Sequence, residues 1–389
     1  MSRLKFSLIP ITVVLTLLCS CKGGGTTAAI AGGDTINFKY AEKLEIVKYD
    51  GYTVAKLSNP WDEGKILHTY ILVSNNGQGT AGNSKYDKQE LLSLFPAATI
   101  VNVPLRRAVI TTSVHCGLLI SLGKKDAIRG ICDLRYINIP WIREQQSQGR
   151  IADCGSGTTP TLEKIIDINA DAVLISPFQH SGGYGRLDEW DKPIIEVADY
   201  METSALGRAE WIKFYGMLFG AEDKADSLFA EIEKNYNQLK TIAKQSNTRK
   251  NVIIDKMSGS VWYVPGGNST IGGIISDANA GYAFSSNNNS GSLPLNFETV
   301  LTQAGESDVW MLRYNSKQPA TYASLASENQ GYSQFKAFKD KQVYGCNTFN
   351  NTFYEETPFR PDLLLRDFVI ITHPDIKQLG QPRYFIRLK

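Results

Sequence analysis

Two of the four histidines, His115 and His180, follow short apolar runs of the kind that form buried β-strands. A neutral imidazole binds transition metals well and is a common axial ligand of heme iron. Either histidine could therefore be an axial ligand to iron or cobalt in a bound chelate, although each also fits a polar packing role. A site for a bare metal ion needs several histidines and carboxylates, and the second half of the chain has only His373. The sequence thus predicts no metal held directly by the protein and no resident cofactor.

Aromatic and cationic side chains gather in further segments that follow apolar runs. Flat rings can bury the plane of a corrin, a porphyrin or a catecholate, and arginine can pair with the anionic groups of such a ligand. Any single aromatic residue would also fit a packing role, but the set predicts a ligand site. Its candidate residues are His115, Arg135, Tyr136, Phe178, His180, Trp262, Tyr263, Arg313, Tyr314, Phe349 and Tyr354.

Motifs for enzyme chemistry are missing from the sequence. It contains no Gly-x-Ser-x-Gly elbow, no His-Glu-x-x-His pair and no P-loop. The glycine-flanked run at residues 155–161 could form a phosphate cradle, but it lacks the lysine and reads better as a loop and helix cap. We predict that the protein is not an enzyme. An extracytoplasmic hydrolase with unrecognised carboxylates is the alternative from that class.

The composition excludes nucleic acid as a partner and favours two lobes. Forty-one basic residues balance 39 acidic ones, which leaves a formal net charge of +2 and no basic surface to attract a phosphate backbone. A chain of 389 residues is long enough for two folding units of ordinary size. We expect a monomer.

The N-terminus reads as a secretion and anchoring signal. Arg3 and Lys5 precede an apolar run at residues 6–18 that is too short to span a bilayer comfortably. The run ends in Leu18-Cys19-Ser20-Cys21, which resembles a bacterial lipobox with Cys21 as the acylated first mature residue. A plain secretory peptide is the alternative. We expect an extracytoplasmic protein that touches a bacterial membrane, on its periplasmic side, only through its lipid.

Four cysteines remain in the mature chain: Cys116, Cys132, Cys154 and Cys346. An oxidising compartment permits disulfides, and four cysteines allow three pairings that sequence does not rank. No Cys-x-x-Cys spacing is present, which argues against a zinc site.

The pattern of apolar residues divides the chain into six parts. Residues 1–21 form the signal and lipobox, and residues 22–37 form a flexible tether. Residues 38–100 alternate like antiparallel strands, with Asp50-Gly51 as a hairpin turn.

The remaining parts form the main body. Residues 101–203 alternate apolar strands with helices, which predicts a parallel α/β lobe, and residues 248–389 repeat that pattern. Residues 204–247 are helical and join the two. Within them, residues 222–244 carry apolar side chains at steps of three and four, and a helix of that length would span roughly 35 Å.

Five motifs in the same order resemble the periplasmic binding proteins that deliver ferric siderophores, heme and cobalamin to ABC importers. The N-terminal ones are the strand and loop at residues 106–115, the turn at 122–130 (Leu-Gly-Lys-Lys-Asp-Ala-Ile-Arg-Gly) and the segment 161–175, which begins Thr-Leu-Glu-Lys-Ile. The C-terminal ones are residues 295–310, which begin Leu-Asn-Phe-Glu-Thr-Val-Leu, and residues 359–374, with Arg-Pro-Asp near the start and His-Pro at the end. The resemblance covers about residues 103–375 and leaves the β-rich extension outside the family core.

This resemblance implies two Rossmann-like lobes joined by one rigid helix, with the ligand in the cleft between them. In such α/β lobes the ligand lies beyond the carboxyl ends of the strands, where most of the candidate residues fall. The resemblance also assigns Glu163 and Glu298, each early on a helix, to salt bridges with the two subunits of the ABC permease. Both would also stabilise their helices through the helix dipole.

We expect a ferric siderophore or heme as the ligand, with cobalamin or another corrinoid as the alternative, because all three suit a wide cleft with aromatics and a few cations. An adhesion lipoprotein is a further alternative, since the extension has no assigned role. Such a protein, however, would need neither the paired glutamates nor the connecting helix.

Overall fold

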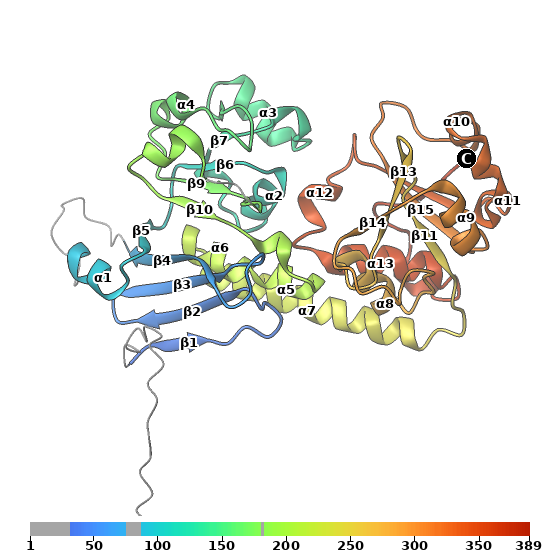
Figure 1. Cartoon of the computed structure of the whole chain (residues 1–389), viewed down its shortest axis with the longest axis horizontal. Helices are drawn as coiled ribbons and strands as arrows, with labels where there is room; N and C mark the ends of the chain where they lie inside the picture. The colour runs from blue at the N-terminus through green and yellow to red at the C-terminus, as the bar shows by residue number, and fades with distance from the viewer. Residues whose placement is uncertain (1–31, 75–86, 180–182) are drawn as a thin grey trace, which may run out of the picture.

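The computed structural model describes residues 32–74, 87–179 and 183–389 (Figure 1). Cys21, the signal segment, most of the tether and His180 lie outside the described residues. Within the described ranges, no helix is both long and apolar enough to cross a membrane.

The N-terminal extension is a five-stranded sheet in the order β1-β2-β3-β4-β5. Its strands are β1 (Asp34–Ile36), β2 (Leu44–Tyr49), β3 (Tyr52–Ser58), β4 (Ile66–Ser74) and β5 (Ala98–Val103). The first four are antiparallel, and Tyr49 pairs with Tyr52 across the predicted Asp50-Gly51 turn. Helix α1 (Lys88–Leu94) and the parallel pairing of β5 with β4 were not predicted.

The N-lobe contains a parallel sheet in the order β10-β9-β6-β7-β8. Its strands are β6 (Ala108–Ile110), β7 (Ile128–Ile131), β8 (Ala152–Asp153), β9 (Ala172–Ile175) and β10 (Ile194–Glu196). Helices α2 (Ser113–Ser121), α3 (Pro140–Ser147) and α4 (Leu162–Asp167) connect them. Strands β6 and β9 are buried along their whole length, as uninterrupted apolar strands in a two-sided sheet should be.

The C-lobe has two sheets. In the first, β11 (Val252–Ile254), β15 (Val309–Tyr314) and β16 (Val343–Asn347) are parallel, and β17 (Ile386–Arg387) closes the edge antiparallel. The second is an antiparallel sheet of β12 (Met257–Ser258), β13 (Val261–Pro265) and β14 (Ser292–Leu295), which was not predicted. The helices of this lobe are α8 (Thr270–Asp277), α9 (Phe297–Ala304), α10 (Tyr322–Glu328), α11 (Lys336–Lys339), α12 (Phe353–Glu356) and α13 (Pro361–Thr372).

One helix, α7 (Glu222–Lys244), runs beneath both lobes, as predicted (Figure 1). It packs against α6 (Ile212–Phe219) on the N-lobe side and against α13 on the C-lobe side. Tyr236 of α7 also donates a hydrogen bond to Asp277 at 2.8 Å. The predicted helix at residues 205–219 is divided into α5 (Ala205–Glu210) and α6. It tightens at Trp211, whose N–H bonds the carbonyl of Arg208 and whose indole donates to buried Glu202.

Two carboxylates attach the extension to these helices. Glu210 on α5 accepts the backbone N–H groups of residues 39–41, and Glu202 accepts those of residues 42 and 43. Both carboxylates are buried, and buried charges are stable only when such donors satisfy them. The extension is therefore a fixed part of the molecule.

Candidate functional site

The two lobes meet where α2 of the N-lobe packs on α12 of the C-lobe (Figure 1). A Cβ atom at Gly117 would collide with the carbonyl oxygen of Glu355, so this approach needs glycine. Beside it, the amide of Asn138 donates to the carbonyl of Thr348 at 2.8 Å. Glu355 is buried in this contact, and burial raises the pKa of its carboxyl.

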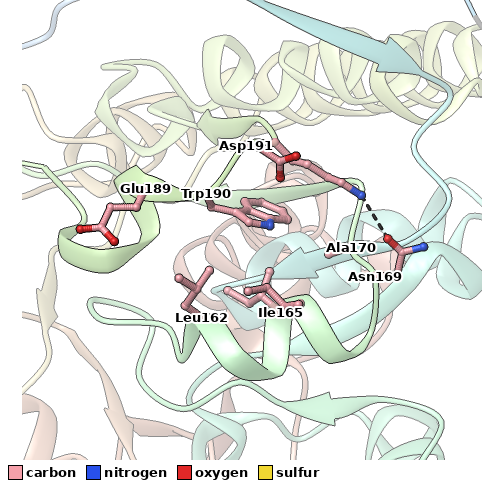
Figure 2. A pocket seen from close by; sticks show the side chains of 9 residues that line it. Leu162, Ile165, Asn169, Ala170, Glu189, Trp190 and Asp191 are labelled. Carbon is pink, nitrogen blue, oxygen red and sulfur yellow. Dashed lines mark hydrogen bonds between the residues drawn. The ribbon is translucent and has the colours of Figure 1, made fainter.

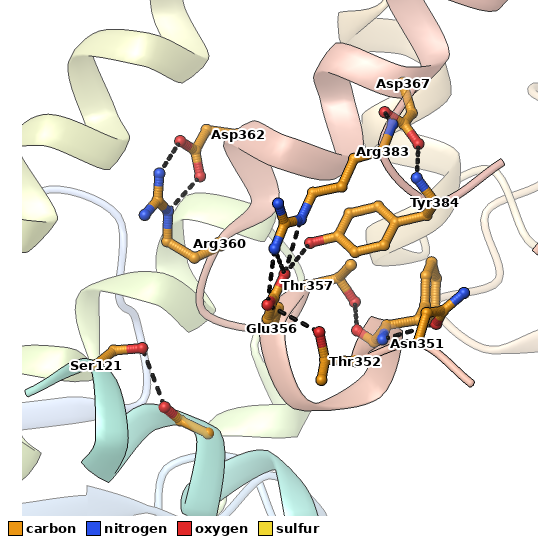
Figure 3. A network of polar contacts seen from close by, with 12 residues as sticks. Ser121, Asn351, Thr352, Glu356, Thr357, Arg360, Asp362, Asp367, Arg383 and Tyr384 are labelled. Carbon is orange, nitrogen blue, oxygen red and sulfur yellow. Dashed lines mark hydrogen bonds and ion pairs between the residues drawn. The ribbon is translucent and has the colours of Figure 1, made fainter. Parts of the chain in front are cut away.

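A polar network holds α12 in place (Figure 3). Arg383 donates to both carboxylate oxygens of Glu356, at 3.0 and 2.9 Å, and the hydroxyl of Tyr384 donates to the same group at 2.8 Å. Asp367 on α13 accepts the backbone N–H groups of residues 383–385. The C-terminal segment thus fixes the helix that faces the N-lobe.

Three of the predicted cleft aromatics lie on the segments that make this contact. Tyr136 lies two residues before Asn138, Phe349 follows Thr348, and Tyr354 precedes Glu355. Their exposed fractions are 63%, 42% and 46%, so each side chain is accessible to solvent. Exposed rings held on a fixed backbone are suited to stacking on a flat ligand.

Arg135 adds a positive charge beside these rings. Its guanidinium lies 4.6 Å from the ring centroid of Tyr136, within the range of a cation–π contact. The side chain is exposed, and no carboxylate among the described residues forms an ion pair with it. Arg135 is therefore available to an anionic ligand.

Arg313, at the carboxyl end of β15, is already paired. Its Nε donates to Oδ1 of Asp255 at 2.9 Å, and this pairing raises the pKa of the guanidinium against the opposing effect of burial. Tyr314, the last residue of β15, is half-buried. Phe178 after β9 and Tyr263 on β13 are both exposed. Tyr263, however, lies in the middle of a strand of the antiparallel sheet and not at the carboxyl end of a strand of the parallel sheet.

The prediction that His115 is a cleft residue is wrong. His115 lies on α2 and is only 2% exposed. Its Nδ1 lies 2.8 Å from the hydroxyl of Thr112, and its Nε2 lies 2.8 Å from Oδ1 of Asp199. With both ring nitrogens engaged, His115 has none for an axial bond to iron or cobalt.

Asp199 is the centre of this buried cluster, and sequence reasoning missed it. It also accepts hydrogen bonds from Nε of Arg208 at 2.9 Å and from the hydroxyl of Tyr215 at 3.0 Å. Burial alone would raise the pKa of Asp199, but the charges of His115 and Arg208 outweigh it and lower the pKa to about 2. The cluster is a structural ion pair, and the position of Asp199 directly after an apolar strand was the only hint of it.

The prediction for Trp262 is also wrong. Trp262 is fully buried, its indole donates to the carbonyl of Ile254 at 2.9 Å, and its ring stacks on Trp310. The alternation of β13 accounts for this, because neighbouring residues of a strand point to opposite faces. Trp262 points into the core and Tyr263 points out.

Glu163 and Glu298 lie in the first turns of α4 and α9, and both are exposed. Glu163 forms an ion pair with Arg186. A backbone N–H group and then Arg186 lower the pKa of its carboxyl. At α9, the side chain of Asn296 caps the helix by accepting the N–H of Thr299 at 2.8 Å. Each lobe therefore presents one of the two glutamates in the first turn of a short helix.

The four cysteines of the described residues, Cys116, Cys132, Cys154 and Cys346, are buried free thiols. Burial raises the pKa of Cys154 and of Cys346 to about 11 in each case, and it raises the pKa values of Cys116 and Cys132 further. Within the described ranges, no three His, Cys, Asp or Glu side chains converge in a way that could hold a metal ion.

The native thiols should therefore react slowly with Ellman's reagent at pH 8, because reactivity follows the thiolate fraction and exposure. In 6 M guanidinium, the soluble domain from Lys22 onward should titrate about four thiols per chain. A denatured titre of about two would instead indicate a disulfide.

Two α/β lobes joined by a long helix, with exposed aromatics at their junction, define a two-lobed solute-binding protein. A family model for periplasmic binding proteins matches residues 109–348. The chain belongs to this family, which supplies the substrate-binding components of ABC importers. The predicted fold is confirmed.

Individual relatives agree with this assignment. An uncharacterized lipoprotein of Methanocaldococcus jannaschii is 26% identical, over 90% of this chain and 84% of its own length. A periplasmic heme-binding protein of Pseudomonas aeruginosa aligns with a TM-score of 0.56 and 15% identity, over 73% of this chain and 98% of its own.

A siderophore-binding protein of Vibrio cholerae, solved with Fe3+–Desferal, aligns with a TM-score of 0.51 and 15% identity, over 69% of this chain and 99% of its own. Identities this low establish the shared fold only. Family membership and the lipoprotein relative together indicate an extracytoplasmic protein whose family members bind solutes rather than catalyse reactions.

Proposed function

We propose that this protein is the lipid-anchored receptor of an ABC importer and that it captures a large metal chelate between its lobes. The observation that carries the proposal is the exposed ring of Tyr136 beside the unpaired cation of Arg135, together with the exposed rings of Phe349 and Tyr354 in the C-lobe segment that contacts the N-lobe. Acylation at Cys21 would hold the receptor at the membrane. Glu163 and Glu298 would each pair with a cation of one permease subunit.

Within this class, a ferric siderophore fits the described residues best. The siderophore itself coordinates the iron, so the protein needs only flat surfaces and a positive charge. Heme usually requires an axial ligand, and three of the four histidines are engaged elsewhere. His68 lies 3.1 Å from Glu196, His115 is bonded to Asp199, and His373 is buried against backbone carbonyls. Among the histidines this leaves His180, which lies outside the described residues. An exposed tyrosine such as Tyr136 or Tyr354 is the other type of axial ligand that the candidate residues offer.

The proposal is tested by titrating the soluble domain from Lys22 onward with a ferric tris-catecholate, hemin and cyanocobalamin, monitored by visible absorption. We expect saturable one-to-one binding of the ferric catecholate at sub-micromolar concentration. A Soret shift with hemin that His180→Ala removes would identify heme instead, and binding of cyanocobalamin alone would identify a corrinoid. Binding of none of the three would overturn the proposal.

Arg135→Ala should weaken binding of the anionic catecholate by about tenfold to a hundredfold, because a charge-assisted contact is worth roughly 1.5–3 kcal/mol. Arg387→Ala, which removes an arginine from the edge strand β17, is the matched control and should leave the affinity within about twofold. Equal affinities for the two variants would exclude Arg135 from the site.

A further inference from the structure

A groove on the outer surface of the N-lobe lies beside Glu163. It has a volume of about 340 Å³ and runs between α4 and the segment 189–192. Figure 2 shows the ring of Trp190 above Leu162 and Ile165, which form an apolar floor. Ile166 lines the same groove and is 56% exposed, so it adds accessible apolar surface beside this floor.

Two polar links join the walls of the groove. The Glu163–Arg186 ion pair joins α4 to the short helix that precedes Trp190. Near the other end, Nζ of Lys192 donates to Oδ1 of Asn169 at 3.1 Å (Figure 2). Arg186 and Glu163 are both largely exposed, with side-chain fractions of 69% and 58%. An ion pair so exposed contributes little and can exchange partners at small cost.

The groove is continuous with the proposed docking point. Glu163 and Ile166 are three residues apart on α4, a spacing that places two side chains on neighbouring positions of one helix face. The rim also carries Glu189 and Asp191, both exposed. Lys192 also lines the groove, but its Nζ is held by Asn169. An occupant should therefore be apolar at its centre and positively charged at the edge near Glu163, Glu189 and Asp191.

We propose that the groove receives an apolar side chain of the ABC permease, next to the permease cation that pairs with Glu163. This inference rests on the docking role proposed above for Glu163. The incoming cation replaces Arg186 as the partner of Glu163, which releases one of the two links between the groove walls. The apolar side chain then packs against Ile166 and Trp190, so that charge and apolar contact act together.

The inference predicts opposite signs for two substitutions. Ile166→Ser should weaken binding of the chelate-loaded receptor to the cognate permease–ATPase complex in nanodiscs by about tenfold, since it removes the burial of most of one isoleucine. Arg186→Ala should strengthen binding, because it removes the residue that competes for Glu163. Chelate affinity should stay within twofold for both variants.

Ile66→Ser is the matched control, because Ile66 is a similarly exposed isoleucine on the extension, and Glu163→Ala separates the two proposals. If Glu163→Ala weakens docking while Ile166→Ser behaves like Ile66→Ser, the groove is not an interface and the docking role of Glu163 stands. If Glu163→Ala has no effect, both proposals are wrong. If Arg186→Ala weakens docking, the exchange of partners is wrong.

Discussion

Replacing both Glu163 and Glu298 by alanine should abolish chelate uptake by intact cells and leave the chelate affinity of the purified receptor unchanged. Each glutamate is an exposed first-turn carboxylate, one in each lobe, and α7 packs against helices of both lobes and so restricts the distance between them. Removing one partner of a desolvated charge pair costs roughly 2–5 kcal/mol. Two such losses would make binding of the receptor to the permease too weak for uptake.

The control for this experiment is the pair Glu90→Ala and Glu222→Ala. Both residues are exposed glutamates in first helical turns, on α1 and α7, so their removal also takes a carboxylate away from a helix dipole. Uptake should remain normal in this control. Normal uptake in the Glu163/Glu298 variant, or loss of its chelate affinity, would contradict the docking assignment.

Asp199→Ala should lower the free energy of unfolding by about 3–5 kcal/mol, because it leaves the buried partners of a charge without compensation. Three donors lose their acceptor: the ring of His115, the guanidinium of Arg208 and the hydroxyl of Tyr215. Urea unfolding at pH 7, monitored by circular dichroism, measures the loss. Asp226→Ala, an exposed aspartate on α7, should change stability by less than about 0.5 kcal/mol.

The same cluster predicts a pH dependence. Asp199 has a folded-state pKa of about 2, below its ordinary value of 3.8. A depressed pKa contributes stability that is complete above the unfolded-state value and is lost as pH falls through the folded-state value. The part of the stability difference between the wild type and Asp199→Ala that comes from this carboxylate should therefore shrink as the pH falls from about 4 to 2. A difference that persists unchanged at pH 2.5 would show that the carboxylate charge is not its source.

The sequence predicted the elements whose cause is local. The helix α7 follows from apolar side chains at steps of three and four, and the β2–β3 hairpin follows from Asp50-Gly51. Both lie where they were predicted. The division of the predicted helix into α5 and α6 at Trp211 was missed, because the indole of Trp211 bonds Glu202, which lies outside the helix.

The site was predicted less well, because burial depends on distant parts of the chain. His115 was expected on a loop, but the side chain of Thr112 caps α2 there and turns the histidine toward Asp199, 84 residues away. Trp262 was expected in the cleft as one of a set of aromatics in segments that follow apolar runs, but it lies within β13, where strand alternation points it inward. The exposed residues Tyr136, Phe349 and Tyr354 lie on segments whose neighbouring residues make the contact between the lobes, and that contact joins residues 210 positions apart in the sequence.

The close approach of α2 to α12, together with the continuous helix below it, has a consequence for how such a receptor is used. A ligand can shift an equilibrium only through a difference in affinity between two states, and a molecule joined at both places has little room for a second state. Empty and loaded copies would then present nearly the same face to the transporter and would compete for it. Import would depend on the ratio of filled to vacant receptors, and overproducing the receptor while the nutrient is scarce would slow uptake rather than speed it.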